Sequence, residues 1–502
     1  MQRWFVLAFT VLALWPAFAQ TASDGGISVD LALRRLDDAK APLRAGHDAE
    51  VFVRLRDQTG APIRGSGING WLSVHRPDTP PLNREECVAR VATFTAGGLF
   101  RQPALDLNVY RVIVLNADAT LSVVDPKVSF GGTSLLAMVQ LESPAEDWAL
   151  DREHRRLFVA MPEAGKVAVI DTGTWKVIAS LAAGARANRI VFQPDGGYVW
   201  AAYDGGVVAI DPRKAEIVAR IKTGSGAHDL VASEDSGTLF VTNSGSGTTS
   251  VIDVHALKVA RQVRTGVNPL SVAWSQLARM AYVASGDGAV TAVDARHAAP
   301  VARIAAVAGI TRIRFAPGGR LAFITNPPKN AVYVLDAPLN RIIQTAIVES
   351  APFEVTFSDT IAYIRHLGSE TVLMVTLANV GQPGAQVSVA DFPGGQRAFG
   401  QSGIAPIPAD GVVQAAGENA VLVTNPADGQ IYYYREGMAA PSAAISAYSH
   451  VPRAALVVDR SLREVEPGLF TTIARMPKAG SYDVALFVGT PRVVTCFQVT
   501  VR

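Results

Sequence analysis

The sequence predicts an all-β protein whose central part is a β-propeller. One observation is a short apolar pattern ending in Asp, which recurs at intervals of about 40–46 residues through the middle of the chain. This is the repeat length of four-stranded propeller blades. A second observation is the abundance of turn-forming residues, with 43 Gly and 29 Pro among 502 residues. Many short strands joined by tight turns require such a composition.

The repeat also predicts the number of blades. Its six clear copies each end a predicted third strand, at Asp125, Asp171, Asp211, Asp253, Asp294 and Asp336. Residues 372–376 and 430–434 continue the series without the Asp, so we predict an eight-bladed propeller closed by strands from the two ends of its segment. Seven blades is the alternative, because the eighth unit is degenerate and follows a long interruption over residues 381–414. We predict that each Asp accepts backbone N–H bonds from the following turn, which is a structural role.

The residues of these units resemble those of a known repeat family. The run Leu-Phe-Val-Thr-Asn at 239–243, followed by Ser-Val-Ile-Asp at 250–253, resembles the YVTN family of β-propellers. The resemblance covers residues 105–437, which we take as the propeller domain. That family is similar to the haem d1 domain of cytochrome cd1 nitrite reductase, whose propeller has eight blades. The resemblance implies an exported setting and raises non-covalent haem as a candidate cofactor, although no cofactor is evident from the residues themselves.

Residues 1–19 have the features of a secretory signal peptide. Arg3 precedes an apolar run, and Ala17-Phe18-Ala19 forms a small-residue cleavage site. The apolar run is shorter than the ~20 residues of a membrane-spanning helix, so we expect a periplasmic or secreted protein with no transmembrane segment in the mature chain. The 46 basic and 44 acidic residues nearly balance, which argues against nucleic acid as a partner.

Strand patterns on both sides of the propeller predict an immunoglobulin-like β-sandwich. Residues 20–104 contain alternating strands and a linker, and residues 438–502 contain further strands, among them 456–459. Tyr482, shortly after Pro477 and Gly480, has the arrangement of a tyrosine corner. Neither half would bury much core alone, so we infer one sandwich assembled from N- and C-terminal strands. Two separate β units is the alternative.

Cys87 and Cys496 are the two cysteines of the chain. In an oxidising compartment a single pair tends to form a disulfide. The alternation of the last strand also directs Cys496 away from the sandwich core, towards the linker that holds Cys87. We therefore predict a bond between them, with two free thiols or thiolate metal ligands as the alternative.

No motif predicts catalysis. The eight histidines stand without metal-ligand spacing, and the chain has no H-E-x-x-H, C-x-x-C-H or G-x-S-x-G motif. Covalent haem c is excluded, and no metal site or catalytic residue is predicted. A binding role is favoured over an enzymatic one.

Propellers bind ligands at the mouth of the central channel, where the inner strands begin. The candidate ligand-binding residues on this channel face are Asp147, Arg189, His228, Asp229, Arg312 and Glu354. His228 is the candidate haem-contacting side chain, and the two arginines suit anionic groups. With one local carboxylate they predict an excess of positive charge, unless Asp147 and Glu354 neutralise it. The alternative is a solvated rim whose charges pair with one another.

These observations favour a periplasmic binding or scaffold protein that engages a small ligand or a partner protein at the channel face, connected with respiratory or metal-cofactor enzymes. One alternative is a haem d1-like cofactor-handling protein or oxidoreductase. The other is a copper-binding electron carrier, because Met438, His450 and Cys496 are residue types of a blue-copper site. That site requires a second His, which this segment lacks.

Overall fold

A computed structural model describes residues 20–65, 67–77, 79–95, 103–126, 134–151, 155–382, 385–416 and 419–502. The expected signal peptide, residues 1–19, lies outside the described residues. The chain forms two compact units, and the larger one, residues 112–457, is inserted between the two segments of the smaller one, which end at residue 111 and begin at residue 458. No helix of the described residues is long and apolar enough to cross a membrane.

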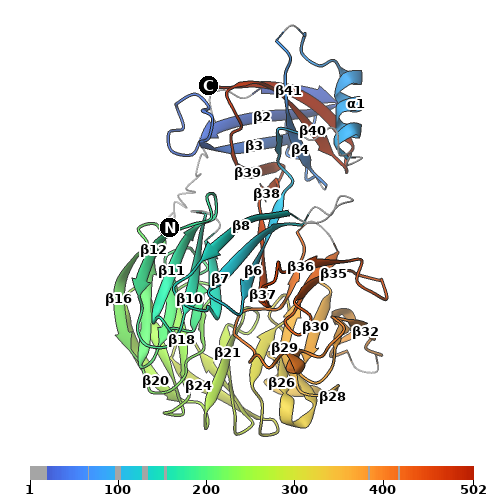
Figure 1. Ribbon diagram of the computed structural model, residues 1–502. Helices are drawn as coiled ribbons and strands as arrows, with labels where there is room; N and C mark the ends of the chain where they lie inside the picture. Colours follow the sequence, from blue (N-terminus) through green and yellow to red (C-terminus); the bar gives the residue numbers. More distant parts are fainter. Residues whose placement is uncertain are drawn as a thin grey trace, which may run out of the picture. The chain divides into compact units, whose positions relative to one another are not determined.

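The larger unit is a β-propeller (Figure 1). Its described residues form eight four-stranded antiparallel sheets, and the first four sheets along the chain follow, each from the inner strand to the outer strand. They are β37 (Pro452–Asp459), β6 (Tyr110–Asn116), β7 (Thr120–Asp125) and β8 (Ser134–Gln140); β9 (Asp147–Asp151), β10 (Arg156–Met161), β11 (Lys166–Asp171) and β12 (Lys176–Ala182); β13 (Arg189–Phe192), β14 (Val199–Tyr203), β15 (Gly206–Asp211) and β16 (Glu216–Lys222); and β17 (Leu230–Ala232), β18 (Thr238–Asn243), β19 (Thr248–Asp253) and β20 (Lys258–Arg264).

The remaining four sheets continue the series in the same order. They are β21 (Pro269–Ser275), β22 (Met280–Ser285), β23 (Ala289–Asp294) and β24 (Ala299–Ala305); β25 (Arg312–Phe315), β26 (Leu321–Asn326), β27 (Ala331–Asp336) and β28 (Arg341–Ile347); β29 (Pro352–Phe357), β30 (Ile361–His366), β31 (Thr371–Thr376) and β32 (Val389–Pro393); and β33 (Val412–Gln414), β34 (Ala420–Asn425), β35 (Gln430–Arg435) and β36 (Ala443–Ser446). Short 3-10 helices lie at Pro327–Lys329, Leu377–Asn379 and Phe399–Ser402.

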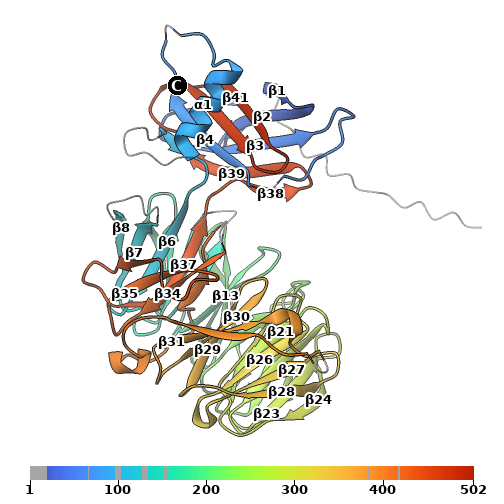
Figure 2. The same ribbon diagram turned by 90° about the vertical axis from the view of Figure 1, so that its right-hand side faces the viewer.

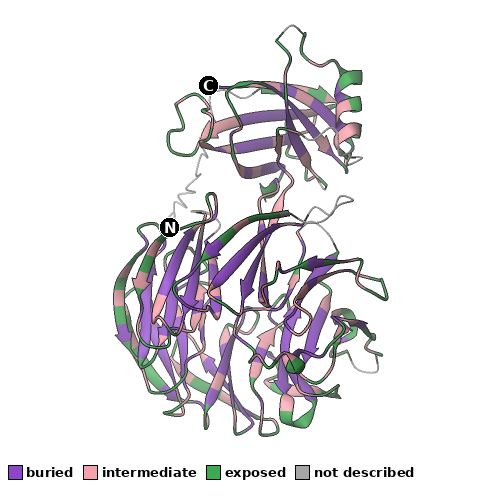
Figure 3. Cartoon of the chain, viewed as in Figure 1, coloured by how far each residue is buried: buried purple, intermediate pink, exposed green. Residues whose placement is uncertain are grey.

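Burial explains the sequence pattern of each sheet. The two middle strands are largely buried because a neighbouring sheet covers each face; Trp200 and Val207, for example, share one core cluster with Leu239 and Ile252 of the next sheet. The outer strands alternate between exposed and partly buried residues, as in β16 (Figure 3). β16 carries charged residues at both ends, which discourages other chains from pairing with the open edge.

The propeller closes through one strand from its C-terminal end. Figure 2 shows β37 beside β6 and β7, and β37 supplies the inner strand of that sheet. The last sheet has its own outer strand, β36, which pairs with β35. Residues 456–459, expected in the sandwich, belong to β37, so the predicted boundary at residue 437 moves to 457.

The smaller unit contains two sheets built from both ends of the chain. One has the order β1 (Gln20–Asp24), β2 (Ile27–Arg35), β3 (Asp48–Arg56), β39 (Leu469–Arg475) and β38 (Arg463–Glu466), and the other β41 (Val493–Val501), β40 (Gly480–Val488), β4 (Asn69–Val74) and β5 (Leu105–Asp106). Val53, Leu72, Val484 and Phe497 lie in one shared core. The predicted start of the propeller at residue 105 is wrong, because β5 pairs with β4.

The tyrosine-corner hydrogen bond is present in the smaller unit. The Tyr482 hydroxyl donates to the backbone carbonyl of Lys478, four residues upstream, at 2.6 Å. The ring itself is buried in the core of this unit. The bond fixes the chain where it enters β40.

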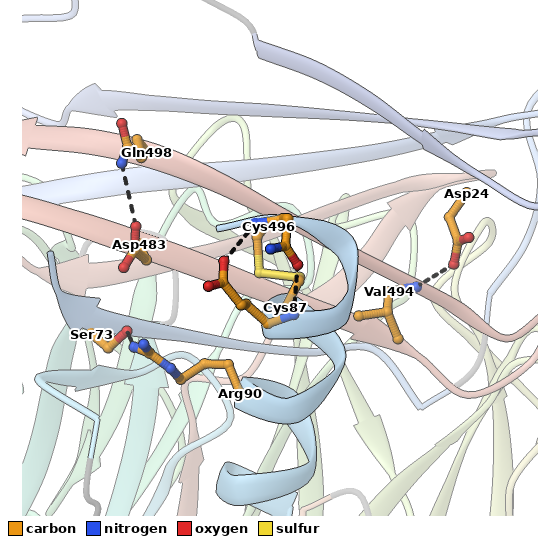
Figure 4. Close-up of a disulfide and its surroundings, with 10 residues drawn as sticks. Asp24, Ser73, Cys87, Arg90, Asp483, Val494, Cys496 and Gln498 are labelled. Atoms are coloured by element: carbon orange, nitrogen blue, oxygen red, sulfur yellow. Dashed lines mark hydrogen bonds between the residues drawn. A yellow bond between two sulfur atoms is a disulfide. The ribbon is translucent and has the colours of Figure 1, made fainter. Parts of the chain in front are cut away.

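A disulfide joins the two segments of the smaller unit, as predicted. Cys87 is bonded to Cys496 of β41 (Figure 4). Cys87 lies in a helix, α1 (Arg84–Thr95), where a linker was expected. Asn83 and Glu86 bond reciprocally, each side chain accepting the backbone N–H of the other residue. The residues of this capping box, Asn83 and Glu86, are the sequence signal from which the start of this helix could have been predicted.

Candidate functional site

The six candidate residues stand at or near the start of inner strands, as expected. Asp147, Arg189 and Arg312 are the first residues of β9, β13 and β25, and Asp229 immediately precedes β17. These four residues line a cavity of about 900 Å³ on the propeller axis. His228 and Glu354 are not among the described residues that line it.

The polar residues at the starts of the inner strands form a ring around the propeller axis: Asp147, Arg189, Asp229, Ser271, Arg312 and Glu354. Most of these side chains bond to the backbone of the next sheet. Asp147 Oδ2 accepts the N–H of Ile190 at 3.0 Å, and Asp229 Oδ2 accepts the N–H of Val272 at 2.9 Å. These N–H groups face the edge of an inner strand, where the sheet itself offers no partner. A carboxylate from the preceding sheet therefore satisfies each of them and links the two sheets.

The same bond recurs further round the ring with other acceptors. Ser271 Oγ accepts the N–H of Ile313 at 3.3 Å. Glu354 Oε1 accepts the N–H groups of Gly411 and Val412 at 2.6 and 3.2 Å. Glu354 also pairs with buried Arg365 at 3.0 Å. The ring is therefore primarily a set of bonds between sheets, and Glu354, a predicted ligand contact, is occupied by this structural role.

Arg189 cannot accept a hydrogen bond, and it pairs instead with two carboxylates. Its Nη1 lies 2.5 Å from Asp147 Oδ2 and its Nε 2.7 Å from Asp229 Oδ1. Burial alone would lower the pKa of Arg189, but Asp229 and Asp147 raise it above its ordinary value. The predicted excess of positive charge is absent at Arg189, because these two carboxylates neutralise it.

Arg312 is the other arginine of the ring and differs from Arg189. Within the part of the chain that the structure describes, no carboxylate lies within ion-pair distance of it, and its Nη2 donates to the carbonyl of Pro408. Burial, reinforced by the nearby charge of Arg314 and partly offset by Asp410 and Glu354, lowers the pKa of Arg312 below its ordinary value. Arg312 is therefore a partly buried cation on the cavity wall, with no carboxylate within ion-pair distance among the described residues.

His228 faces away from the cavity. Its side chain is buried, and its Nδ1 lies 2.6 Å from the carbonyl oxygen of Thr242. Burial lowers the pKa of His228, which favours the neutral ring with Nδ1–H as the donor. His228, the candidate haem-contacting side chain, is therefore not among the described residues that line this cavity, and its ring bonds to the backbone of its own sheet.

A segment of the chain spans the end of the channel where the inner strands begin. This segment, residues 405–410, is termed the strap. The Ala409 N–H donates to the carbonyl of Glu146 at 3.1 Å, and Arg314 binds both carboxylate oxygens of Asp410 at 2.7 and 3.1 Å. The sheets of Glu146 and Arg314 are separated by three described sheets in either direction. The strap must therefore cross the axis.

The strap places the opening of the cavity at the opposite end from the one predicted. Pro408, Ala409 and Asp410 form part of the cavity lining, and Asp147 and Ser271 beside them are buried. At the other end the lining residues Pro194, Glu234, Gln276 and Pro317 are exposed. The cavity is therefore a cup. The strap forms its floor at the end where the mouth was predicted, and the cup is open at the other end.

A glycine allows the strap to join the last sheet. At Gly411 a Cβ would lie 1.9 Å from Arg365 Nη1. Any side chain there would displace Arg365 from Glu354, which holds the Gly411 N–H.

Aromatic side chains form the walls of the cup. The lining includes Trp148, Phe192, Trp274, Phe315 and Phe357. The Nε1 of Trp274 is buried and has no hydrogen-bond partner in the described structure. Sequence analysis missed these walls, although aligning the inner strands beyond their first residues would have found them.

The described lining residues include no His, Cys, Met or Tyr. These are the residues that supply an axial ligand to haem iron, so the cavity does not fit a haem held by a protein ligand. The copper alternative is also wrong, because Cys496 is in a disulfide and Met438 and His450 belong to the other compact unit. Among the described residues, no group of three or more metal-ligating side chains was found.

Comparison with known proteins agrees with the fold. The family model described as "Cytochrome D1 heme domain" matches residues 152–266 and 201–369. The propeller is cytochrome d1-like. No curated protein matches the chain.

Solved structures match this d1-like propeller at low sequence identity. Apo AztD from Citrobacter koseri aligns at a TM-score of 0.55 with 14% identity, over 70% of this chain and 98% of that one. A second Citrobacter koseri AztD structure gives 0.54 with 14% identity, over 72% and 100%. Dihydro-heme d1 dehydrogenase NirN in complex with DHE gives 0.49 with 13% identity, over 70% and 74%. At this identity the likeness to the two AztD structures concerns the fold alone.

Proposed function

We propose that this protein is an exported binding protein whose propeller cavity holds a small organic acid with an aromatic or apolar body. The observation that carries this proposal is Arg312, the ring arginine without a carboxylate partner among the described residues. A cation that is partly withdrawn from water, as Arg312 is, is stabilised by a paired anion. An acidic group at the floor of the cup would pair it.

The remaining lining supports the same class of ligand. The aromatic walls suit an apolar body. A cup with one open end suits a small molecule better than a partner protein, which would need an extended surface. The charged residues of the floor other than Arg312 are already engaged in bonds between sheets.

We also propose an eight-bladed propeller, an immunoglobulin-like sandwich and a periplasmic location. Eight described four-stranded sheets support the blade number. The two packed sheets and the hydrogen bond of Tyr482 support the sandwich. The disulfide, together with the signal peptide predicted for residues 1–19, supports export to an oxidising compartment.

Binding of anilinonaphthalene sulfonate, a fluorescent aromatic anion, tests the proposed site. Arg312→Met should weaken its binding by about tenfold or more, because a charge-assisted hydrogen bond is lost. Trp274→Phe should weaken it less, since the ring remains. Arg279→Met is the matched control, because Arg279 forms an exposed pair with Asp235 and does not line the cavity. Equal binding by the wild type and the Arg312→Met variant would refute the site.

A haem d1-like cofactor-handling role is the second candidate, favoured by the family match. The described cavity lining supplies no axial ligand, which weighs against it. A visible absorption spectrum of protein purified from its native host decides between the two. Haem bands that persist through gel filtration would support the cofactor role, and a colourless protein would support the organic-acid site.

A further inference from the structure

We infer that an acid bound at Arg312 loosens the strap and opens the floor of the cavity, so that ligand occupancy is transmitted to the opposite end of the channel. This inference rests on the proposed function, because it requires an anion at Arg312. The structure supplies the coupling through one shared donor. The guanidinium that would hold the acid is the group that now holds the strap at Pro408.

A competition between two acceptors drives the coupling. The Pro408 carbonyl is a neutral acceptor, whereas a carboxylate or sulfonate is charged. Hydrogen bonds between a guanidinium and an anion are roughly twice as strong as bonds with a neutral partner. An anion that takes over the Nη2 donor of Arg312 therefore displaces the carbonyl of Pro408 from it.

The strap is held unevenly, and this asymmetry determines which part moves. Its C-terminal end is firmly anchored: Arg314 binds Asp410 twice, and the Ala455 N–H donates to the Asp410 carbonyl at 3.0 Å. At its N-terminal end, Arg453 reaches the Ala405 carbonyl at 3.3 Å, and the buried Arg453 Nε has no partner.

Between these ends, two bonds hold the strap. Arg312 bonds the carbonyl of Pro408, and the next residue, Ala409, donates its N–H to Glu146. Losing the Arg312 bond leaves residues 405–408 held by the Arg453 contact and by the packing of the buried Ile407 side chain. This part would move about the fixed Asp410.

Hydrogen exchange read by mass spectrometry tests the inference. The reporting peptide covers residues 404–411, in which Pro406 and Pro408 carry no N–H and the Ala409 N–H, bonded to Glu146, reports loosening of the strap. The comparison peptide covers residues 189–192, where the Ile190 N–H is bonded to Asp147. Saturating anilinonaphthalene sulfonate should accelerate exchange in the strap about tenfold and leave the comparison peptide unchanged. Arg312→Met should give the same acceleration without the probe, because it removes the same bond. The Arg279→Met protein should behave like the wild type.

The outcomes separate this inference from the proposed function. If the probe binds through Arg312 and strap exchange stays constant, the coupling is refuted and the binding site stands. If the probe fails to bind, the proposed function fails, and the Arg312→Met protein without probe still decides whether Arg312 holds the strap. Unchanged exchange in that variant would refute the coupling as well.

Discussion

At the scale of single residues, the type of side chain at the start of each inner strand determines whether that residue has a structural role or is available for binding. Where the ring residue is an acceptor, as in Asp147, Asp229, Ser271 and Glu354, it bonds an N–H of the next sheet. An arginine has no acceptor atom and cannot make this bond. Arg189 is instead held between two of these carboxylates.

Replacing Arg189 tests this division. Arg189→Met should destabilise the propeller by about 3–5 kcal/mol, because it leaves Asp147 and Asp229 buried without their partner. Arg312→Met should cost much less, since it removes one bond to a carbonyl and a partly buried charge that has no carboxylate partner among the described residues. Urea unfolding of both variants measures the difference. If the two variants lose similar stability, the structural role of Arg189 is wrong.

At the scale of the repeating unit, the Asp that ends the third strand organises the turn to the outer strand. Asp171 accepts the N–H groups of Gly173 and Thr174, and Asp211 accepts that of Arg213. Asp253, Asp294 and Asp336 make equivalent bonds. The predicted structural role of these carboxylates is confirmed, and it accounts for the Asp in the repeat.

These turns make the propeller sensitive to acid. Burial alone would raise the pKa of Asp171 and Asp211, but the N–H bonds of the turn lower it below the ordinary 3.8. A carboxyl with a lowered folded pKa stabilises the fold above its ordinary pKa, and this stabilisation is lost as the pH falls through the folded value. Between about pH 5 and about pH 2, the urea midpoint of the wild type should fall more steeply than that of Asp171→Asn/Asp211→Asn. Parallel curves would contradict this explanation.

At the scale of the whole molecule, the disulfide closes a very long loop. Its cysteines are 409 positions apart, yet both lie in the smaller unit. Cys87 lies on α1 and packs with Val91 and Trp71, beside Val494 of β41 (Figure 4). The bond therefore fastens the N-terminal helix to the last strand of the chain.

Removing the disulfide should weaken the smaller unit selectively. The chain-entropy model gives about 6 kcal/mol for a loop of this length, and measured disulfides contribute about 2–4 kcal/mol. In Cys87→Ser/Cys496→Ser, calorimetry should show the transition of the smaller unit at a lower temperature, with that of the propeller unchanged. Reduction of the wild type should give the same shift. A single transition at the wild-type temperature would refute the prediction.

The sequence by itself determined the propeller, its strand pattern, the role of the third-strand Asp and the disulfide partners. These features depend on the spacing of the repeat, on the residues of its turns and on the presence of two cysteines. All of these can be read from a single repeat or from the composition. It also placed Asp147, Arg189, Asp229 and Arg312 at one end of the channel, because equivalent positions of a repeat converge on its axis.

The tertiary structure alone decided which end of the channel is open and which arginine is unpaired. The strap reaches Arg312 and Arg314 across 96 positions, and Arg189 meets its carboxylates across 40 and 42. The strap lies within residues 381–414, which interrupt the repeat. This stretch has no repeat pattern from which the position of the strap could be predicted. Contacts of this kind depend on how the ring closes, because each partner is brought into reach by sheets that lie between them in the sequence.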